Sequence, residues 1–301
     1  MTRPNLIYTV AIDAPGTGGY RTMAKMLASS LLRTQFTGEI IVFRNSPEPL
    51  FQMERMGLVE IHLQLPVANG VAATTEQGWA TKYRVRNLVQ ERIERGGFEK
   101  VMFADCDCLA LRNIDTLLEG EDWDLLYYPE RGRPINDRVF SCFLSDEEIG
   151  GDRSSVREKS GWAPLPLRRA GINSGTWAVR AEHYLTVMET WEKCDTGPAL
   201  QERLFSEQGA WNRLILNCGI SVVPGGQAGE VGRLPWRVRP FERDAIQRPL
   251  CGDPRWQDYS EASLVHFFGA SPKDKLQFMF SLFMGNFYCD ETAVLFHLLE
   301  T

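Results

Sequence analysis

The sequence has no apolar run approaching the roughly 20 residues of a membrane-spanning helix, and its first residues, MTRPNLIYTV, lack the build of a signal peptide. It also has no excess of positive charge, because 33 Lys and Arg against 39 Asp and Glu give a net charge of −6. We therefore expect no transmembrane segment and no nucleic-acid partner. Seven cysteines, an odd number at irregular spacing, argue against a disulfide framework, so we expect a cytoplasmic protein in a reducing compartment.

What the first third of the chain does have is an alternation between apolar strands and helical patterns. The expected strands are residues 5–12, 39–45, 58–66 and 100–105. A Gly-rich turn follows the first strand, and the helix after it carries on one face Met23, Met26, Leu27, Ser30 and Leu31. A second helix over residues 78–95 is expected to turn inward Trp79, Tyr83, Leu88 and Ile93. This alternation predicts an α/β fold with a parallel, doubly wound sheet and helices on both faces.

The alternation is less regular after residue 115. Residues 131–170 are rich in Arg, Gly, Pro and Ser and are expected to form a long surface excursion. Later strands are expected at 124–130, 171–180, 221–225 and 263–269, and later helices at 181–193, 200–217 and 275–300. Because the sequence contains no repeats and no low-complexity linker, we expect one mixed α/β domain over residues 1–301, with two halves.

Two aspartates follow the strand at 100–105. Because side chains alternate faces along a strand, we expect Asp105 and Asp107 to point one way and Cys106 and Cys108 the other. Carboxylates at the carboxyl end of a parallel strand lie where open α/β sheets hold ligands. Hard oxygen donors suit Mg²⁺ or Mn²⁺, and such an ion can stabilise the charge of a departing diphosphate. The pair therefore favours a metal-diphosphate site.

Other readings of this region carry less weight. A second Asp-x-Asp, Asp122 and Asp124, follows Gly and Glu in place of an apolar strand, and is expected to be a polar turn. A zinc site through Cys106 and Cys108 is not favoured, because no second cysteine pair or nearby histidine completes four ligands. The Gly-rich turn lacks the Lys-Ser/Thr ending of a P-loop and the third glycine of a dinucleotide fingerprint.

Five segments, in order through most of the chain, resemble a known family. They are TKYRVRNL, FADCDCLAL, GINSGTWAVR, SEQGAWNRL and LVHFFGASPKDKL. Together they resemble the retaining nucleotide-sugar glycosyltransferases of the GT-A fold, typified by glycogenin and the bacterial lipopolysaccharide galactosyltransferases. The resemblance implies a GT-A-like, Rossmann-like mixed sheet. It also implies a nucleotide-binding half over residues 1–115, a donor-sugar and acceptor half over 116–270 and a C-terminal helical segment over 271–301.

The resemblance assigns roles residue by residue. The ion ligands it implies are Asp105, Asp107 and His266. The residues it implies for the nucleotide, the diphosphate or adjoining sugar oxygens are Asp13, Lys82, Asp105, Gly269 and Lys273. The residues it implies for the donor sugar are Asn173, Glu207 and Gln208, with Gln208 nearest the reacting carbon. A solvated Lys82, a turn at Asn173, an ordinary helix position for Gln208 and a core His266 remain as structural alternatives.

The chain departs from the family pattern at three places. Glu207 stands where the family usually has Asp, which displaces the sugar contact by a methylene. Ile172 replaces the aromatic residue before Asn173. The spacing from His266 to Lys273 is one residue longer than in the family, so Lys275 is an alternative to Lys273 at the diphosphate.

The function that the resemblance implies is that of a metal-dependent glycosyltransferase, a hexosyltransferase. It would use Mn²⁺ or Mg²⁺ and move a sugar from a nucleotide-sugar donor, a UDP-sugar, to an unknown acceptor that is a glycan, lipid or protein. Retention of configuration follows from the family likeness only. A sugar-phosphate nucleotidyltransferase and a non-catalytic nucleotide-sugar-binding module are the two alternatives.

Overall fold

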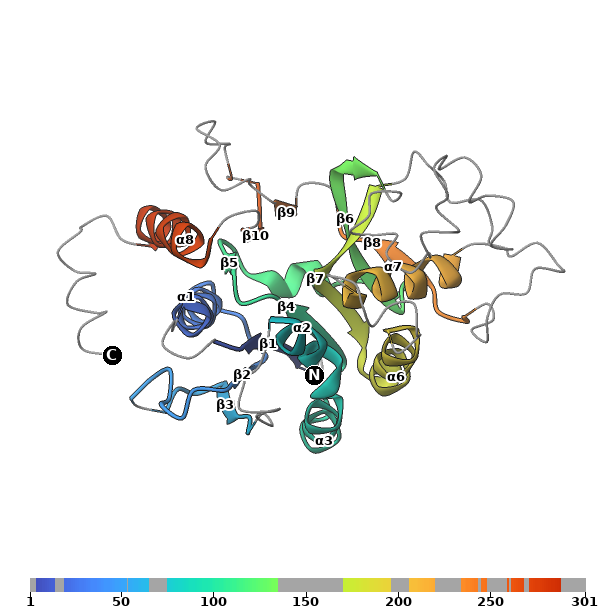
Figure 1. The fold of residues 1–301 in the computed structure, drawn as a ribbon, viewed down its shortest axis with the longest axis horizontal. Coiled ribbons are helices and arrows are strands. Elements are labelled where there is room, and N and C mark those ends of the chain that lie inside the picture. The colour runs from blue at the N-terminus through green and yellow to red at the C-terminus, as the bar shows by residue number, and fades with distance from the viewer. Residues whose placement is uncertain are drawn as a thin grey trace, which may run out of the picture. The chain divides into compact units, whose positions relative to one another are not determined.

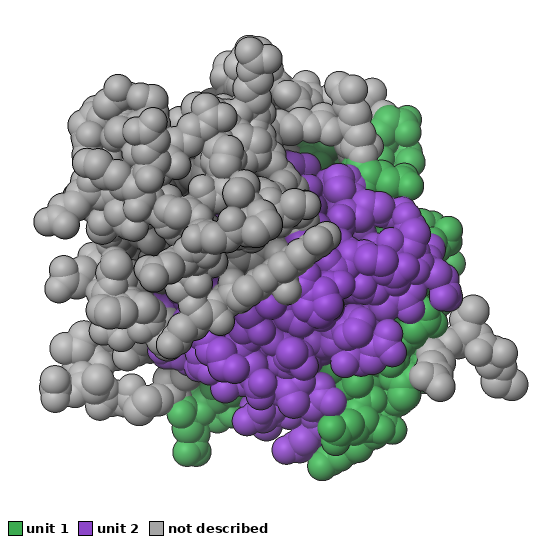
Figure 2. All heavy atoms as spheres, turned by 90° about the vertical axis from the view of Figure 1, so that its right-hand side faces the viewer, with its two compact units in different colours: residues 1–82, 93–119, 242–301 green, residues 83–92, 120–241 purple. Residues whose placement is uncertain are grey.

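The structure is a computed structural model (Figure 1). It describes residues 4–13, 19–52, 54–64, 75–134, 170–195, 206–219, 234–242, 245–247, 259, 261–267 and 271–287. The chain divides into two compact units, shown in different colours in Figure 2. Unit 1 comprises residues 1–82, 93–119 and 242–301, and unit 2 comprises residues 83–92 and 120–241. The change of unit after residue 119 is near the boundary expected after residue 115, whereas residues 83–92 and 242–270 belong to the other unit from the half expected for them.

The sheet of unit 1 is parallel, as the alternation of strands and helices predicts. Its strands are β1 (Asn5–Ala11), β2 (Glu39–Arg44), β3 (Leu58–His62) and β4 (Lys100–Ala104), in the order β3-β2-β1-β4. Neighbouring strands in this order all pair in parallel. The five residues of β4 are all buried, because a parallel strand covered on both faces has no solvent side. The mixed α/β class with a parallel N-terminal part is thereby confirmed.

Helix α1 (Gly19–Arg33) buries the face that its sequence pattern predicts, from Met23 to Leu31. It packs against α8 (Pro272–Phe287), and the two helices lie side by side in Figure 1. It also packs against β5 (Cys108–Ala110), where the amide of Ala110 donates to Ser30 Oγ at 3.0 Å. Helix α8 covers part of the helix expected over 275–300, and residues 288–301 lie outside the described residues.

A small second sheet in unit 1 joins distant parts of the chain. Its order is β5-β10-β9, with β9 at Ile246–Gln247 and β10 at Leu264–His266. Strand β10 pairs antiparallel with β5 and parallel with β9. A 3₁₀ turn, η1 (Ile114–Leu118), follows β5, and the carboxylate of Asp115 accepts from Asn5 Nδ2 and from the Thr37 hydroxyl.

The helix expected over 78–95 is two helices, α2 (Thr75–Arg84) and α3 (Arg86–Gly96). Tyr83 and Val85 are both buried, although residues two apart on one continuous helix face nearly opposite sides. The break at Val85 accommodates both side chains. Ile93 is buried as expected, whereas Leu88 is 39% exposed, so its inward assignment was wrong, because the pattern assumed one uninterrupted helix. The side chain of Trp79 lies outside the described residues.

Unit 2 contains β6 (Leu125–Pro134), β7 (Ala170–Arg180) and β8 (Val238–Pro240), in the order β7-β6-β8. Strand β6 is antiparallel to β7 and parallel to β8. The ends of the surface excursion expected at 131–170 belong to strands, because β6 extends to Pro134 and β7 begins at Ala170. Residues 135–169, and the strand expected at 221–225, lie outside the described residues.

Helices of unit 2 supply an aromatic core. After the short η2 (Ala181–His183) come α6 (Tyr184–Asp195) and α7 (Ser206–Gly219). Trp177, Trp191 and Trp211 are fully buried, and the ring centroids of Trp191 and Trp211 are 4.6 Å apart. Large buried aromatic rings provide much of the apolar burial of a domain, so this triad fixes α6 and α7 to β7.

The second Asp-x-Asp forms the bend ahead of β6, as expected for a turn. Asp124 is buried and accepts from Arg237 Nη2 at 2.7 Å and from the Arg237 amide at 2.8 Å. These hydrogen bonds from Arg237 lower the pKa of Asp124. Asp124 therefore joins β8 to β6. Among the described residues, no helix is both long and apolar enough to cross a bilayer.

Candidate functional site

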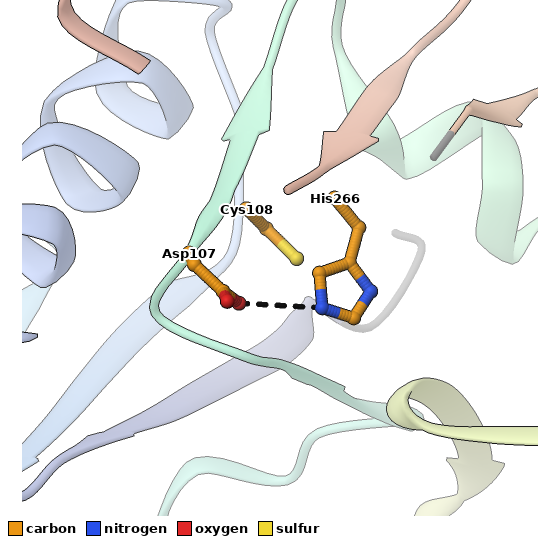
Figure 3. Close-up of side chains that lie close together, drawn as sticks. All are labelled: Asp107, Cys108 and His266. Carbon is orange, nitrogen blue, oxygen red and sulfur yellow. Dashed lines mark ion pairs between the residues drawn. The ribbon is translucent and has the colours of Figure 1, made fainter. Parts of the chain in front are cut away.

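The chain turns directly after β4, at the two predicted metal ligands. Strand β4 ends at Ala104, and the Cys108 amide donates to the Asp105 carbonyl oxygen at 3.0 Å, closing a turn. Alternation of faces holds only within a strand, so the prediction that Asp105 and Asp107 oppose Cys106 and Cys108 was wrong. Cys108 begins β5, and its sulfur lies on the side of Asp107 (Figure 3).

His266 reaches this turn from the far part of the chain. In the β5–β10 pair it stands directly opposite Cys108, and the Phe267 amide continues the pairing by donating to the Asp107 carbonyl oxygen at 3.0 Å. The His266 Nε2 lies 3.2 Å from Asp107 Oδ1, the ion pair drawn in Figure 3, and 3.7 Å from Asp105 Oδ2. The structure thus brings the three predicted ion ligands together within unit 1.

The ligand atoms of Asp107, Cys108 and His266 form the tightest group. All three residues are buried, and their ligand atoms lie within 4.8 Å of one another. Asp107 Oδ1 and His266 Nδ1 are buried atoms without a hydrogen-bond partner among the described residues, and His266 Nε2 approaches Asp107 Oδ1 as an ion pair at 3.2 Å. Buried polar atoms left without partners are costly, by about 1–3 kcal/mol each. These donors therefore fit a small divalent cation.

Two lysines neutralise the aspartates. Lys82 Nζ, from α2, lies 3.1 Å from Asp105 Oδ1, and Lys275 Nζ, from α8, lies 2.5 Å from Asp107 Oδ2. Lys82 is buried, so it is not a solvated helix lysine. Of the two candidate lysines on α8, Lys273 is exposed and Lys275 contacts the aspartate.

Charges at this site hold Asp107 ionised. Burial alone would raise the pKa of Asp107, but the Lys275 ammonium and the His266 imidazole more than offset burial, and the pKa lies below its ordinary value. For Lys275, burial opposes the charged form, yet the Asp107 carboxylate dominates and raises its pKa. The pair is thus a buried ion pair whose members each require the other.

The two remaining unit 1 residues implied for the nucleotide are Asp13 and Gly269. The Asp13 carboxylate accepts from the amides of Tyr20 at 2.8 Å and Arg21 at 2.9 Å, in the first turn of α1. These are amides that a helix leaves without internal partners, so Asp13 acts as an N-terminal cap. Asn45 holds the backbone of Asp13 through two further hydrogen bonds. Gly269 lies outside the described residues.

The three residues implied for the donor sugar gather in unit 2, around a bulge in β7. Tyr127 pairs with Trp177 and the next residue, Tyr128, pairs with Asn173, so the residues between Asn173 and Trp177 have no counterpart on β6. The buried Asn173 donates from Nδ2 to Gln208 Oε1 at 3.1 Å and accepts from the Gly175 amide at 2.8 Å. The bulge explains why polar residues interrupt an otherwise apolar strand.

Glu207 and Gln208 lie in the first turn of α7. The Glu207 carboxylate accepts from Ser174 Oγ at 2.9 Å and from the Gln208 amide at 2.6 Å, and the Glu207 carbonyl oxygen accepts from Trp191 Nε1. These bonds fix Glu207 in the position that the resemblance gives to an Asp. Because the longer side chain already has hydrogen-bond partners here, it is accommodated within the network.

Asn212 is a residue of this cluster to which the sequence analysis assigned no role. Its amide makes a two-point contact with the backbone of Ile172, accepting from the Ile172 amide at 2.8 Å and donating to its carbonyl oxygen at 2.6 Å. It also donates to the Gln208 carbonyl oxygen at 2.8 Å. Its place in SEQGAWNRL, four residues after Gln208 on one helix face, was the available signal.

The site residues therefore form two clusters, one in each unit. The cluster of unit 1 combines carboxylates, an imidazole, a thiol and two ammonium groups, a set suited to a cation and a polyanion. The cluster of unit 2 consists of hydrogen-bonding amide, hydroxyl and carboxylate groups. No protein-family model matches the chain, and a search of the curated proteins found no match.

Proposed function

We propose that this chain is a metal-dependent glycosyltransferase of the GT-A fold. On this proposal it binds a UDP-sugar and transfers the sugar, with retention, to a glycan, lipid or protein acceptor. The observation that supports it most is the convergence of Asp105, Asp107 and His266 at the carboxyl end of β4. Open α/β sheets bind their ligands at such strand ends.

Asp105, Asp107 and His266 would hold Mn²⁺ or Mg²⁺. Such an ion supplies stabilisation of the negative charge that develops on a departing diphosphate. Lys275 and Lys82 each carry a positive charge already placed against an ion ligand. With the aspartates engaged by an ion, both ammonium groups would become available to diphosphate oxygens. The aspartates would then bind the cation, and the two lysines would bind the anion.

At the sugar, the proposal assigns contacts to Asn173, Glu207 and Gln208. The Asn173 amide donates to Gln208 Oε1, which sets the orientation of the Gln208 side chain. An amide is a poor nucleophile, so the chain's residues favour attack by the acceptor hydroxyl on the face that the diphosphate leaves. Gln208 would orient the donor and stabilise positive charge on the sugar by its carbonyl oxygen.

Titration calorimetry with UDP tests the proposal. We expect UDP to bind at least about tenfold more tightly with Mn²⁺ than with EDTA, because the aspartates and the diphosphate otherwise repel each other. Asp107→Asn, which keeps the side-chain volume, should remove the effect of Mn²⁺. The matched control is Asp122→Asn in the second Asp-x-Asp, where Asp122 pairs with Arg239 on an exposed surface and the effect of Mn²⁺ should persist.

Equal affinity for UDP in the two buffers would contradict the metal-diphosphate assignment. If UDP binding depends on Mn²⁺, incubation with a panel of nucleotide sugars separates the alternatives. A transferase releases UDP when its acceptor is present. Without an acceptor it releases UDP only slowly, by transferring the sugar to water. A nucleotidyltransferase consumes a sugar phosphate and a nucleoside triphosphate, and a binding module turns over neither.

A further inference from the structure

We propose that the Cys108 sulfur is a ligand of the ion site, and that the site therefore binds thiophilic divalent cations, Zn²⁺ and Cd²⁺, more tightly than Mn²⁺ or Mg²⁺. The inference rests on the proposed function only in taking this site to be one for a divalent ion. It needs neither nucleotide binding nor sugar transfer. It also adds a sulfur ligand to the set of Asp105, Asp107 and His266 that the family resemblance implies.

Backbone pairing places the thiol at the site. Cys108 and His266 are directly opposite each other in the antiparallel β5–β10 pair, so their side chains leave the same face of this small sheet. Asp107 precedes Cys108 in the turn, and its carbonyl oxygen is held by the Phe267 amide at 3.0 Å. Two adjacent ladder contacts therefore fix the relative positions of carboxylate, sulfur and imidazole, which point toward one another in Figure 3.

The tightest ligand group includes the thiol and omits one aspartate. Asp107, Cys108 and His266 have ligand atoms within 4.8 Å of one another, whereas Asp105 stands 3.7 Å from His266 and is held by Lys82. Asp107 Oδ1 and His266 Nδ1 are buried and lack hydrogen-bond partners among the described residues. A cation bound between these groups would give Asp107 Oδ1 a ligand partner in place of the hydrogen bond that it lacks among the described residues.

The chemistry of this set decides the ion. Carboxylate, imidazole and thiolate are all ligands of Zn²⁺, and three protein ligands leave a fourth tetrahedral position for a substrate oxygen. Thiolate is a soft donor that suits Zn²⁺ and Cd²⁺ and suits Mg²⁺ poorly. On binding, Cys108 would release its thiol proton to solvent and coordinate as the thiolate.

Cd²⁺ alone is the probe, added to the full chain after EDTA treatment and desalting, with a non-thiol reductant present. We expect about one equivalent to produce an ultraviolet sulfur-to-cadmium charge-transfer band. Cys108→Ala and Cys108→Ser should lose that band, and calorimetry should show at least about a tenfold loss of Cd²⁺ affinity. Mn²⁺ affinity should fall by a smaller factor, because Mn²⁺ gains little from sulfur.

Cys106→Ser is the matched control. Cys106 is a buried thiol in the same turn but is not in the ligand group, so its replacement should leave the band in place. The inference would be overturned if both Cys108 variants kept the cadmium band and the Cd²⁺ affinity of the unaltered protein. It would also be overturned if Cys106→Ser lost the band and the affinity to the same extent as the Cys108 variants. X-ray absorption of the unaltered protein with one equivalent of Cd²⁺ adds a measurement that needs no variant, and a coordination shell without sulfur would also overturn it.

The outcomes for this inference and for the proposed function are separable. A Cys108-dependent cadmium band, together with equal UDP affinity in Mn²⁺ and in EDTA, would support the sulfur ligand and contradict the glycosyltransferase proposal. The opposite outcome is UDP binding that depends on Mn²⁺ and is unchanged by Cys108→Ala, with no cadmium band in the unaltered protein. It would support the proposed function and contradict the sulfur ligand.

Discussion

Replacing Lys275 by Met should destabilise the metal-free protein by about 3 kcal/mol at neutral pH. The Asp107 and Lys275 side chains are only 9% and 16% exposed, and their charged atoms are 2.5 Å apart. Removing one member of a buried pair costs about 3–5 kcal/mol, because the other charge is left without compensation. We take the lower end because neither side chain is completely buried. Met preserves the apolar stem of lysine, so the charge is the principal change.

The destabilisation should depend on pH with a definite sign. The pKa of Asp107 lies below its ordinary value, so the pair contributes stability above about pH 4, where an unfolded Asp ionises, and loses it as the pH falls through the folded-state pKa. Without Lys275, burial acts to raise the pKa of Asp107. Protonation of Asp107 at lower pH then removes the uncompensated buried charge that destabilises the variant. The deficit should therefore be greatest near pH 7 and shrink as the pH is lowered toward about 4.

Urea unfolding in EDTA, at neutral and mildly acidic pH, measures this deficit. With a slope of about 3 kcal/mol/M, a loss of about 3 kcal/mol lowers the midpoint by about 1 M. Lys82→Met is the matched control, because its partner Asp105 is 27% exposed and can be solvated, so about 1 kcal/mol is expected. Equal midpoints for Lys275→Met and the unaltered protein at pH 7, or a deficit that grows in acid, would refute the reasoning.

Two further predictions concern the cluster of unit 2. Asn212→Ala removes three buried hydrogen bonds to backbone and should lower the free energy of unfolding by about 2–4 kcal/mol, measured as a shift of the urea midpoint. A loss of less than about 0.5 kcal/mol in the free energy of unfolding would show that water replaces the hydrogen bonds of the amide. Gln208→Ala should reduce turnover of a UDP-sugar at least about tenfold and leave UDP affinity within about twofold in calorimetry, and unchanged turnover would remove Gln208 from the proposed site.

Much of the fold of unit 1 could be predicted because its signals are local. The apolar run at residues 39–45 and the buried face of α1 are set by the period of each element, and both were confirmed. Leu88 shows where this fails: the period alone does not reveal that the helix breaks at Val85, and the break turns Leu88 outward. Element type follows from periodicity, whereas breaks depend on what the neighbouring elements bury.

The candidate site shows the same limit at the level of single side chains. Lys273 and Lys275 could not be separated from the sequence, because residues two apart on a helix point nearly opposite ways and only the docking of α8 decides which faces Asp107. Cys108 was assigned to the opposite face because the alternation of faces along β4 was continued past the end of the strand, into the turn that the Cys108 amide closes with the Asp105 carbonyl oxygen. His266 joined the site through resemblance to a family, since no local pattern links it to β5.

The ion pair between Asp107 and Lys275 also has a consequence for synthesis. The two residues are 168 positions apart, with the whole of residues 120–241 between them. At about 5–20 residues per second, a ribosome needs roughly 10–30 seconds to reach Lys275 after Asp107 has been made. During that interval the nascent chain carries Asp105 and Asp107 without β10 and α8, the elements that supply His266 and Lys275. Unit 1 is therefore the first unit to be started in the order of translation and among the last parts to be completed.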